Sequence, residues 1–478
     1  MDIKNLFADH ENIEITGIKV DNRQVEAGDL FICIKGYTVD GHDYAKQAEM
    51  SGAAAVVAER EIPGLLIPQI LVGSTKVELP RLASIFFGNP TEKMDVYGVT
   101  GTNGKTTTAY ILEHLLTGFE EETAYIGTNG IRYAQTALEP KNTTPEAYSL
   151  QKLFKEMVES GVKNVAMEVS SHALELHRVD YCRFGTTMFT NLTEEHLDFH
   201  PTMEHYFQAK AKLFRMMPPE GVAVVNTDDG YGARLAAELR AEGIKVMSYG
   251  TSLGADLRAA DIEMTTTGAR FDLVTKQGTY DVRTPLLGTF NVYNCMAALG
   301  AVLSRGMALE TGIRLLNTLP GIDGRMELID EGQDFTVIVD YAHTPDGVQQ
   351  VLEFVSDIKQ NDISVVIGCA GDRDRTKRPV IAKLSVDYAD EVIFTTDDPH
   401  SEDPKAILDE MTSGIEEAQY EVILDRIEAI EAAIAKAKKN DILVIAGRGH
   451  QKLQYWKSGD IELDDRVVTR ELLRKKLS

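Results

Sequence analysis

The chain has 478 residues, of which 43% are hydrophobic, so it is long enough to form two or three domains with their own cores. It contains 74 acidic residues against 49 Lys and Arg, and its net charge of −25 disfavours nonspecific binding to nucleic acids or anionic membranes. The cysteines Cys33, Cys182, Cys295 and Cys369 lie far apart without CxxC spacing, which predicts buried thiols in a reducing compartment. No apolar run has the length of a membrane span and the first residues lack a signal-peptide pattern, so the cytoplasm is the expected location.

The first segment, residues 1–92, predicts a small α/β domain. Short apolar runs at 13–20, 29–34, 53–59 and 69–73 have the composition of strands, and residues 79–88 have that of a helix. The tripeptide Asn89-Pro90-Thr91 then interrupts the pattern before the next strand. We therefore expect a domain boundary near residue 92.

The run VTGTNGKTTT at residues 99–108 predicts a phosphate-binding loop between a strand and a helix. In such a loop the backbone N–H groups of residues 101–104 point at phosphate oxygens, Lys105 neutralises phosphate charge and the Thr106 hydroxyl holds Mg²⁺. Because Val99 stands where the strict GxxxxGK[ST] pattern has glycine, we expect a related loop geometry, with a glycine-rich turn that binds nothing as the alternative. The expected ligand is a nucleoside triphosphate.

Two series of apolar strands occupy the rest of the chain. In residues 93–324, strands at 95–100, 163–170, 185–192 and 221–229 alternate with helical patterns, which predicts a mostly parallel sheet. In residues 325–478, strand patterns within 335–346, 363–374, 391–399 and 441–450, with an amphipathic stretch at 404–418, predict a separate Rossmann-like domain. The fold class is therefore α/β, in three domains.

Polar residues just past the strand ends are the candidates for a site, because open α/β sheets bind their ligands there. Thr106 and Glu168, with ATP phosphates and waters, are suitable oxygen ligands for magnesium. His196 is a less usual magnesium ligand, and a single histidine is more often structural. Lys210, considered alone, has the pattern of a lysine on a helix surface, and strand-end acids also serve as helix caps.

Eight motifs in order along the chain resemble those of the Mur ligase family. They are TGTNGKTTT at 100–108, NTTPE at 142–146, MEVSSHALELHRV at 167–179, TNLTEEHLDFH at 190–200, FNVYN at 290–294, DYAHTPD at 340–346, GDRDRTKRP at 371–379 and GRGHQ at 447–451. The resemblance covers nearly the whole chain and is strongest to the members that add the third amino acid of the peptidoglycan stem peptide. It implies an N-terminal domain for the uridine nucleotide, a central P-loop ATPase and a C-terminal domain for the amino acid.

The resemblance also implies the reaction. ATP phosphorylates the carboxylate of UDP-N-acetylmuramoyl-L-alanyl-D-glutamate, the amine of a diamino acid attacks the acyl phosphate, and phosphate leaves a tetrahedral intermediate. Alignment and charge neutralisation by Lys105 and two magnesium ions suffice for such a transfer. In the family the lysine at the position of Lys210 is carbamylated by CO₂, so Lys210 is expected to be N6-carboxylysine beside His196, with Lys212 as an unmodified neighbour.

The family pattern assigns further residues by position. The residues assigned to catalysis are Lys105, Glu168, His196 and Lys210. Those assigned to ATP binding are Gly101, Thr102, Asn103, Gly104, Lys105, Thr106, Thr107, Asn291, Arg325, Asp340, Tyr341 and His343, and those assigned to the uridine-linked substrate are Asp21, Asn22, Arg23, Thr143, Thr144, Ser170 and Arg178. The expected magnesium ligands are Thr106, Glu168 and His196. Residues 321–324 are the expected hinge between the central and C-terminal domains. In the family a glutamine commonly stands two residues before the arginine at the position of Arg178, whereas this chain has Leu176 there.

The residues assigned to the incoming amino acid depart from one family pattern. They are Arg373, Asp397, Asp398, His400, Gly447 and Gln451. Arg373 matches the family arginine that binds the α-carboxylate of the amino acid. Members specific for meso-diaminopimelate, however, have the sequence DNPR where this chain has DDPH at 397–400, and they have glutamate where this chain has Gln451. Since the aspartates suit a lysine ammonium, we expect L-lysine first, meso-diaminopimelate second and ornithine third.

Two more distant alternatives have different functions. Folylpolyglutamate synthetases have a similar GTNGKT loop, but the segments at 142–146 and 167–174 and the additional N-terminal domain favour a cell-wall substrate. A nonenzymatic nucleotide-gated binding protein would have lost catalytic residues, whereas Lys105, Thr106, Glu168 and Lys210 are all present. By analogy with the family, a monomer without nucleic-acid or membrane partners is expected.

Overall fold

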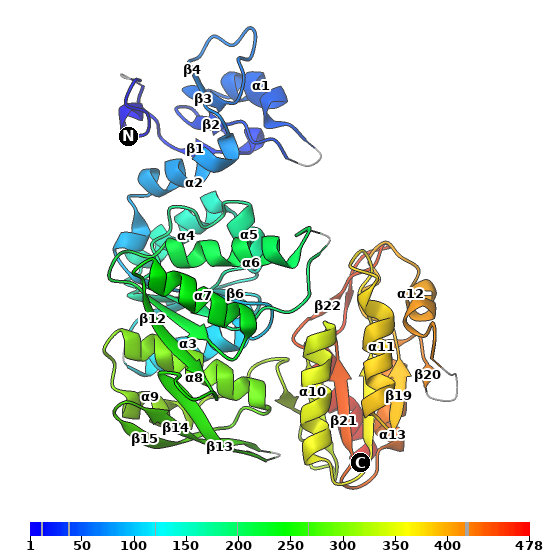
Figure 1. Cartoon of the computed structure of the whole chain (residues 1–478). Coiled ribbons are helices and arrows are strands. Elements are labelled where there is room, and N and C mark those ends of the chain that lie inside the picture. The colour runs from blue at the N-terminus through cyan, green and yellow to red at the C-terminus, as the bar shows by residue number, and fades with distance from the viewer. Residues whose placement is uncertain (11–12, 37–38, 120, 198, 266, 416–419) are drawn as a thin grey trace.

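The computed structural model describes residues 1–10, 13–36, 39–119, 121–197, 199–265, 267–415 and 420–478. Three sheet-containing segments follow one another along the chain (Figure 1). The N-terminal segment lies above the central one, and the C-terminal segment lies beside the central one.

The N-terminal segment contains a small parallel sheet in the order β1-β2-β3-β4. Its strands are β1 (Ile18–Lys19), β2 (Leu30–Ile32), β3 (Ala55–Ala58) and β4 (Gln69–Leu71). Its helices are η1 (Ile3–Asn5), η2 (Asn22–Gln24), η3 (Gly41–Tyr44), α1 (Ala45–Met50) and α2 (Thr75–Phe86). The predicted strands and the helix are present, although the first strand is much shorter than the apolar run at 13–20.

The central segment contains an eleven-stranded sheet in the order β15-β14-β13-β12-β11-β10-β5-β9-β6-β7-β8. The strands are β5 (Asp95–Thr100), β6 (Thr123–Gly127), β7 (Gly130–Tyr133), β8 (Thr136–Leu138), β9 (Asn164–Glu168), β10 (Thr186–Phe189), β11 (Val222–Asn226), β12 (Lys245–Gly250), β13 (Leu257–Thr265), β14 (Gly268–Thr275) and β15 (Gly278–Thr284). From β13 to β6 all pairs are parallel, and hairpins at both edges are antiparallel. The helical elements are η4 (Pro90–Glu92), α3 (Lys105–Gly118), α4 (Ala147–Glu159), α5 (Ser171–Glu175), α6 (Met203–Ala211), η5 (Lys212–Arg215), α7 (Gly230–Ala241), α8 (Thr289–Ser304) and α9 (Leu309–Leu316).

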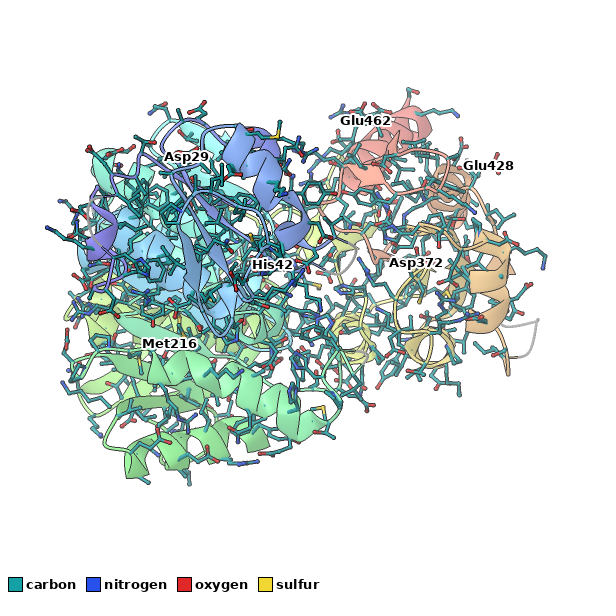
Figure 2. The ribbon with its side chains drawn as sticks, turned by 90° about the horizontal axis from the view of Figure 1, so that it is seen from above. Asp29, His42, Met216, Asp372, Glu428 and Glu462 are labelled. Atoms are coloured by element: carbon teal, nitrogen blue, oxygen red, sulfur yellow. The ribbon has the colours of Figure 1, made fainter. Side chains whose placement is uncertain are left out.

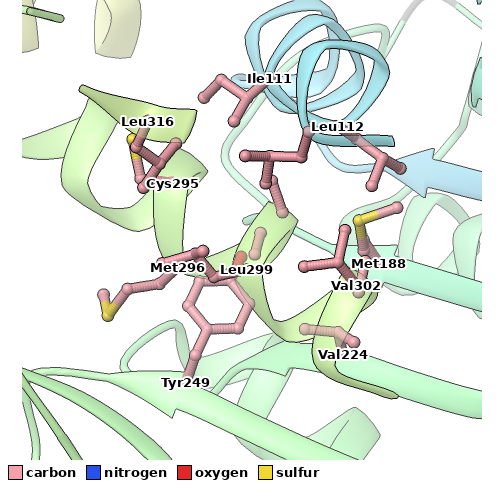
Figure 3. Close-up of a cluster of buried hydrophobic side chains, with 14 of the residues drawn as sticks. Ile111, Leu112, Met188, Val224, Tyr249, Cys295, Met296, Leu299, Val302 and Leu316 are labelled. Carbon is pink, nitrogen blue, oxygen red and sulfur yellow. The ribbon is translucent and has the colours of Figure 1, made fainter. Parts of the chain in front are cut away.

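Helices cover both faces of the central sheet, which explains why its middle strands, such as β5 and β9, are buried almost throughout. Alternate residues of β5 point to opposite faces: Val99 packs in the cluster with α3 and α8, while Val96 packs in the cluster with α4 and α7. In Figure 3, Leu299 and Val302 of α8 lie between Leu112 of α3 and the strands. This packing fixes α3, and therefore the loop at its start, against the sheet.

The C-terminal segment contains a mixed six-stranded sheet in the order β16-β17-β21-β18-β19-β20 and a separate hairpin. The strands are β16 (Glu327–Leu328), β17 (Thr336–Asp340), β18 (Ile363–Ile367), β19 (Glu391–Phe394), β20 (Glu421–Val422), β21 (Ile442–Ala446), β22 (Leu453–Gln454) and β23 (Ile461–Glu462). The helices are α10 (Pro345–Ile358), α11 (Lys377–Tyr388), α12 (Pro404–Met411), α13 (Arg426–Lys436) and α14 (Asp465–Leu477). Helix α12 covers the first part of the amphipathic stretch at 404–418, and residues 416–418 of that stretch lie outside the described residues.

The predicted α/β class, with its largely parallel central sheet and a Rossmann-like C-terminal sheet, is confirmed. All four cysteines are buried thiols, and burial raises the pKa of Cys33, Cys295 and Cys369 to about 12. Among the described residues, no helix is both long enough and apolar enough to cross a membrane. The domain boundaries at residues 92 and 324 remain predictions.

Replacing Asp465 by Ala tests a buried ion pair of the C-terminal core. Arg426 donates from Nε and Nη2 to the two carboxylate oxygens of Asp465 at 2.8 and 2.7 Å, and both side chains are fully buried. Because D465A leaves the guanidinium unpaired, we expect a loss of about 3–5 kcal/mol in the free energy of unfolding. Urea unfolding followed by the fluorescence of Trp456, the single tryptophan, measures this loss.

The matched control is K475A, since the Lys475–Glu431 pair is exposed and should contribute less than about 1 kcal/mol. Equal unfolding free energies for D465A and K475A would contradict the prediction.

Candidate active site

The loop between β5 and α3 has the strand, loop and helix arrangement that the sequence predicts. Gly104, at the start of α3, has φ +84°, and a side chain there would collide with Asn294 of α8. The Lys105 ammonium donates to the carbonyl oxygens of Gly101 and Thr102 at 3.0 and 2.7 Å. The loop thus forms the turn at a helix N-terminus that suits phosphate binding.

Glu168, at the end of the neighbouring strand β9, is fully buried beside this loop. One carboxylate oxygen accepts from the Thr106 hydroxyl at 2.9 Å and the other from the Tyr125 hydroxyl at 2.8 Å. The backbone N–H of Thr128 donates to the second oxygen, also at 2.8 Å. The structure therefore brings Thr106 and Glu168 together, and it adds Tyr125 and Thr128, which the sequence analysis missed.

Lys210 is buried, which overturns its interpretation as a surface lysine. Its ammonium donates to the carbonyl oxygen of Gly101 at 2.6 Å and lies 4.4 Å from the centre of the Tyr206 ring. Burial and the nearby charge of Lys105 hold the pKa of Lys210 well below 10.5. His196 packs edge-on against the same tyrosine ring, with 6.2 Å between ring centres. Lys210 and His196 thus meet at Tyr206, as their assignment to one site requires.

Glu195 is a further charged residue of this site that the sequence analysis did not single out. It lies 3.7 Å from His196 and 3.8 Å from His343, which comes from the C-terminal segment. Burial alone would raise the pKa of Glu195. Electrostatic attraction from His196, His343 and Lys105 nevertheless holds this pKa below 4.5. Its position in the sequence could have indicated a role, because Glu195 directly precedes the candidate His196.

Hydrogen bonds join the C-terminal segment to the loop and to the start of α3. Arg325 donates to the Thr106 hydroxyl at 3.2 Å, and Asn103 of the loop donates to Asp346, in the first turn of α10, at 2.6 Å. A cleft between the segments is lined by Asn103, Gly104, Thr107, Asn291, Arg325, Asp340, Tyr341 and His343. Most residues assigned to ATP thus face one cleft.

Two of the residues assigned to ATP also stabilise their own surroundings. Asp340 accepts backbone N–H bonds from Met326 and Ala342 at 2.6 and 2.7 Å, and burial raises its pKa. Asn291 donates to the Leu287 carbonyl oxygen at 2.7 Å. Their contact with ATP remains a prediction.

Four of the residues assigned to the uridine-linked substrate are linked to Glu168, one directly and three through a hydrogen-bonded neighbour. The Thr144 hydroxyl donates to the Glu168 carbonyl oxygen at 2.9 Å and accepts from the Ser170 N–H at 3.1 Å. Arg178 donates to the Thr144 carbonyl oxygen at 3.2 Å, and Thr143 lies within hydrogen-bond distance of Thr128. Asp21, Asn22 and Arg23 belong to the N-terminal segment, where Asp21 caps η2 and pairs with Arg23 at 2.8 Å.

The residues assigned to the amino acid lie on three loops at the ends of β18, β19 and β21. Arg373 is exposed, whereas Asp397 and Asp398 are buried. Asp398 forms an ion pair with the fully buried Arg448 and accepts the Tyr455 N–H at 3.2 Å. The carboxylate of Asp398 is therefore already neutralised by Arg448, which weakens the expectation that both aspartates face a ligand ammonium.

Asp397 accepts the N–H of Asp398 at 2.7 Å and lies against Gly447, where a side chain would collide with it. Gln451, on the same loop as Gly447, donates its backbone N–H to the Arg448 carbonyl oxygen. These residues remain candidates for the amino-acid site.

Comparison with known proteins shows where this arrangement recurs. Residues 14–77 match the catalytic domain model of the Mur ligase family, residues 99–302 the Mur ligase middle domain and residues 324–449 the glutamate ligase domain of Mur ligases. The UDP-N-acetylmuramoyl-L-alanyl-D-glutamate–2,6-diaminopimelate ligase of Bacillus cereus is 46% identical over 474 residues, which cover 98% of this chain and 96% of the relative. The chain belongs to the Mur ligase family. It is therefore an ATP-dependent ligase that forms an amide bond.

Solved structures agree with this membership. A UDP-N-acetylmuramoyl-L-alanyl-D-glutamate–2,6-diaminopimelate ligase superposes with a TM-score of 0.73 at 32% identity, covering 100% of this Mur ligase and 99% of that chain. A folylpolyglutamate synthase of Mycobacterium tuberculosis has a TM-score of 0.66 at 16% identity, covering 84% and 95% of the two chains. At that identity the likeness shows a shared fold alone.

Replacing Glu168 by Gln tests the buried carboxylate beside the loop. An amide retains the volume but removes the negative charge and places an NH₂ group against the hydroxyl donors of Thr106 or Tyr125. We expect kcat for phosphate release to fall by on the order of 100-fold or more.

The control is E156Q on α4, because Glu156 also accepts a tyrosine hydroxyl, that of Tyr133 at 3.0 Å, but is partly exposed. Wild-type turnover in E168Q would refute a role for this carboxylate in the reaction.

Proposed function

We propose that this Mur ligase uses ATP to join a diamino acid to UDP-N-acetylmuramoyl-L-alanyl-D-glutamate. The observation that carries the proposal is the position of Glu168: its side chain contacts Thr106 of the loop, and its carbonyl oxygen contacts Thr144 of the predicted substrate group. Phosphate-binding and substrate-binding residues therefore meet at one residue. The names of its relatives support the same substrate.

Magnesium fits the oxygen donors beside the loop. The Thr106 hydroxyl and the Glu168 carboxylate are buried oxygens 2.9 Å apart, and His196 is the third predicted ligand. Within the described ranges, no three His, Cys, Asp or Glu side chains are grouped closely enough to hold a metal. Few protein ligands are the usual pattern for magnesium, which binds one or two carboxylates together with substrate phosphates. When bound, the ion neutralises the charge of the transferring phosphoryl group.

Lys105 and Arg325 are two of the basic residues at this site. Lys105 at the start of α3 would meet a terminal phosphate bound by the loop, and Arg325 contacts Thr106 from the C-terminal segment. Contacts such as those of Arg325 and Asn103 would hold the two segments together around the acyl phosphate and exclude water. Residues 321–324 are the proposed hinge.

Lys210 has the chemical properties that carbamylation requires. A neutral amine attacks the carbon of CO₂, a new N–C bond forms, one proton passes to solvent and a carbamate anion remains. The depressed pKa of Lys210 raises the fraction of neutral amine near neutral pH. We propose that the carbamate supports the second magnesium beside His196.

Two observations favour different amino acids. His400 and Gln451 stand where diaminopimelate-specific members have arginine and glutamate, and an imidazole lacks the forked donors with which a guanidinium binds a distal carboxylate, which favours L-lysine. The names of the relatives, 2,6-diaminopimelate ligases at 41 to 46% identity, favour meso-diaminopimelate. We propose L-lysine on the strength of this chain's own residues, with meso-diaminopimelate as the second candidate. We further propose that the enzyme acts as a cytoplasmic monomer.

Phosphate release tests the proposed substrates directly. The purified enzyme is given ATP, magnesium and UDP-N-acetylmuramoyl-L-Ala-D-Glu with L-lysine, meso-diaminopimelate or L-ornithine, and product mass confirms ligation. We expect the highest kcat/KM with L-lysine because His400 stands where diaminopimelate-specific members have the arginine that binds the distal carboxylate. Preference for meso-diaminopimelate would refute the lysine assignment and retain the ligase, whereas no turnover with any of them would refute the proposed function.

Labelled CO₂ tests the modification of Lys210. After equilibration with ¹³C-bicarbonate at mildly alkaline pH, the ¹³C NMR spectrum should show a carbamate signal that K210A abolishes together with activity. Lys212 is the matched control, since it is exposed and paired with Glu175 at 2.6 Å, and K212A should retain the signal and the activity. A signal that persists in K210A would place the carbamate elsewhere.

A further inference from the structure

Two loops of the C-terminal segment carry the residues assigned to opposite ends of the incoming amino acid. Arg373 lies on the loop between β18 and α11, and His400 lies on the loop between β19 and α12. The Arg373 side chain is exposed, and its Nη1 is 3.4 Å from the Asp372 carbonyl oxygen, a weak contact. The spacing of the two side chains therefore depends on how the two loops are held together.

Glu402, two residues after His400, joins these loops. One of its carboxylate oxygens accepts the backbone N–H of Asp372 at 2.6 Å. The same carboxylate accepts hydrogen bonds from both terminal nitrogens of Arg378, at 2.8 and 2.9 Å, and the Arg378 side chain is fully buried. A forked, buried guanidinium fixes the orientation of a carboxylate more strictly than a single donor does. Glu402 is thus held by Arg378 while it holds the residue next to Arg373.

Backbone contacts bring the two loops close on the same side. Gly371 donates its N–H to the Asp398 carbonyl oxygen at 2.8 Å, and a side chain at Gly371 would collide with the carbonyl oxygen of Pro399. The Asp372 carboxylate accepts the Ser401 hydroxyl at 2.7 Å and its N–H at 3.1 Å. Figure 2 shows Asp372 within the C-terminal ribbon, away from the N-terminal residues Asp29 and His42.

The opposite flank of the second loop is held as well. His400 donates its backbone N–H to the Tyr455 carbonyl oxygen at 2.9 Å, and the two rings stack with centres 5.6 Å apart and planes 10° from parallel. Gln454 donates to the Asp397 carbonyl oxygen at 2.6 Å. Since the loop is fixed to the hairpin on this side, a change at Glu402 would alter its distance to Arg373 rather than release it completely.

We infer that Glu402 is a positioning residue that sets the spacing between Arg373 and His400 and thereby the discrimination between diamino acids. The inference rests on the proposed function, because it assigns these two side chains to one substrate. L-Lysine and meso-diaminopimelate share the α-carboxylate and differ at the distal end by one carboxylate. A change in loop spacing alters the fit of the distal end relative to the α-carboxylate, so it affects the two amino acids unequally.

Glu410 offers a matched control within the same ion-pair group. Its carboxylate also accepts from Arg378, at 2.7 Å, and it lies on α12. Its described contact with the Arg373 loop is an ion pair with the exposed Arg375 side chain, which holds a backbone weakly, whereas Glu402 accepts a backbone N–H of that loop. A role confined to stability predicts the same effect for E402Q and E410Q. A positioning role predicts a change in amino-acid selectivity for E402Q alone.

The experiment measures kcat and KM of wild type, E402Q and E410Q for L-lysine and meso-diaminopimelate, at saturating ATP and uridine substrate. In E402Q, we expect KM for the preferred amino acid to rise about fivefold or more and the ratio of the two kcat/KM values to shift by about threefold or more. The KM values for ATP and the uridine substrate should stay within about twofold of wild type, since those sites lie elsewhere. In E410Q the ratio should stay at the wild-type value.

A second variant keeps the test decisive if E402Q folds poorly. S401A removes an exposed hydroxyl that bonds to Asp372 and should shift the selectivity ratio in the same direction by a smaller factor. An unchanged ratio in both E402Q and S401A, or equal shifts in E402Q and E410Q, would overturn the positioning role. Absence of turnover in the wild type with any diamino acid would instead refute the proposed function itself.

Discussion

The buried carboxylate of Glu168 is the interaction on which the site depends. Placing a charge at the end of a central strand is unfavourable unless hydrogen bonds satisfy it, and Thr106, Tyr125 and Thr128 supply them. Those donors come from α3, from β6 and from the residue that follows β6, so the carboxylate ties the phosphate-binding loop to the neighbouring strands. Any rearrangement of the loop must also find new partners for this charge.

The second constraint is that the cleft predicted to bind ATP is built by two segments. The loop and Asn291 belong to the central segment, whereas Asp340 and His343 belong to the C-terminal segment, and they line the same cleft. The described contacts between the two sides include the Asn103–Asp346 hydrogen bond and the packing of Leu287 in one apolar cluster with Met326. The junction is therefore held by apolar packing as well as by polar contacts, and each polar contact can be exchanged for water at little cost.

The sequence was most informative where one local pattern determines the outcome. Continuous apolar strands predicted the buried central sheet, and the motif at 99–108 predicted the loop, because period and turn chemistry act over a few residues. Thr106 and Glu168 were predicted to lie together, but other pairings between distant residues escaped prediction. Arg448 forms an ion pair with Asp398, which is 50 positions away in the sequence. Lys210 donates a hydrogen bond to Gly101, 109 positions away, and Glu402 accepts one from Asp372, 30 positions away. Such partners depend on which strands become neighbours, and no local pattern states that.

The charge distribution explains why an acidic protein can act on anionic substrates. With a net charge of −25, attraction of nucleotides requires local cations, and Lys105, Arg325 and Arg178 are the predicted ones. Lys210 is the exception in this group, since it shares the Gly101 carbonyl oxygen with Lys105, and two ammonium groups so close repel each other. In the proposed carbamylated form, the negative carbamate of Lys210 would attract the Lys105 ammonium instead of repelling it. The side chain would then no longer compete with Lys105 for the Gly101 carbonyl oxygen and would itself present oxygen atoms beside Lys105. The burial that makes a lysine unfavourable as a cation at this position is therefore the property that would make it useful as a carbamate.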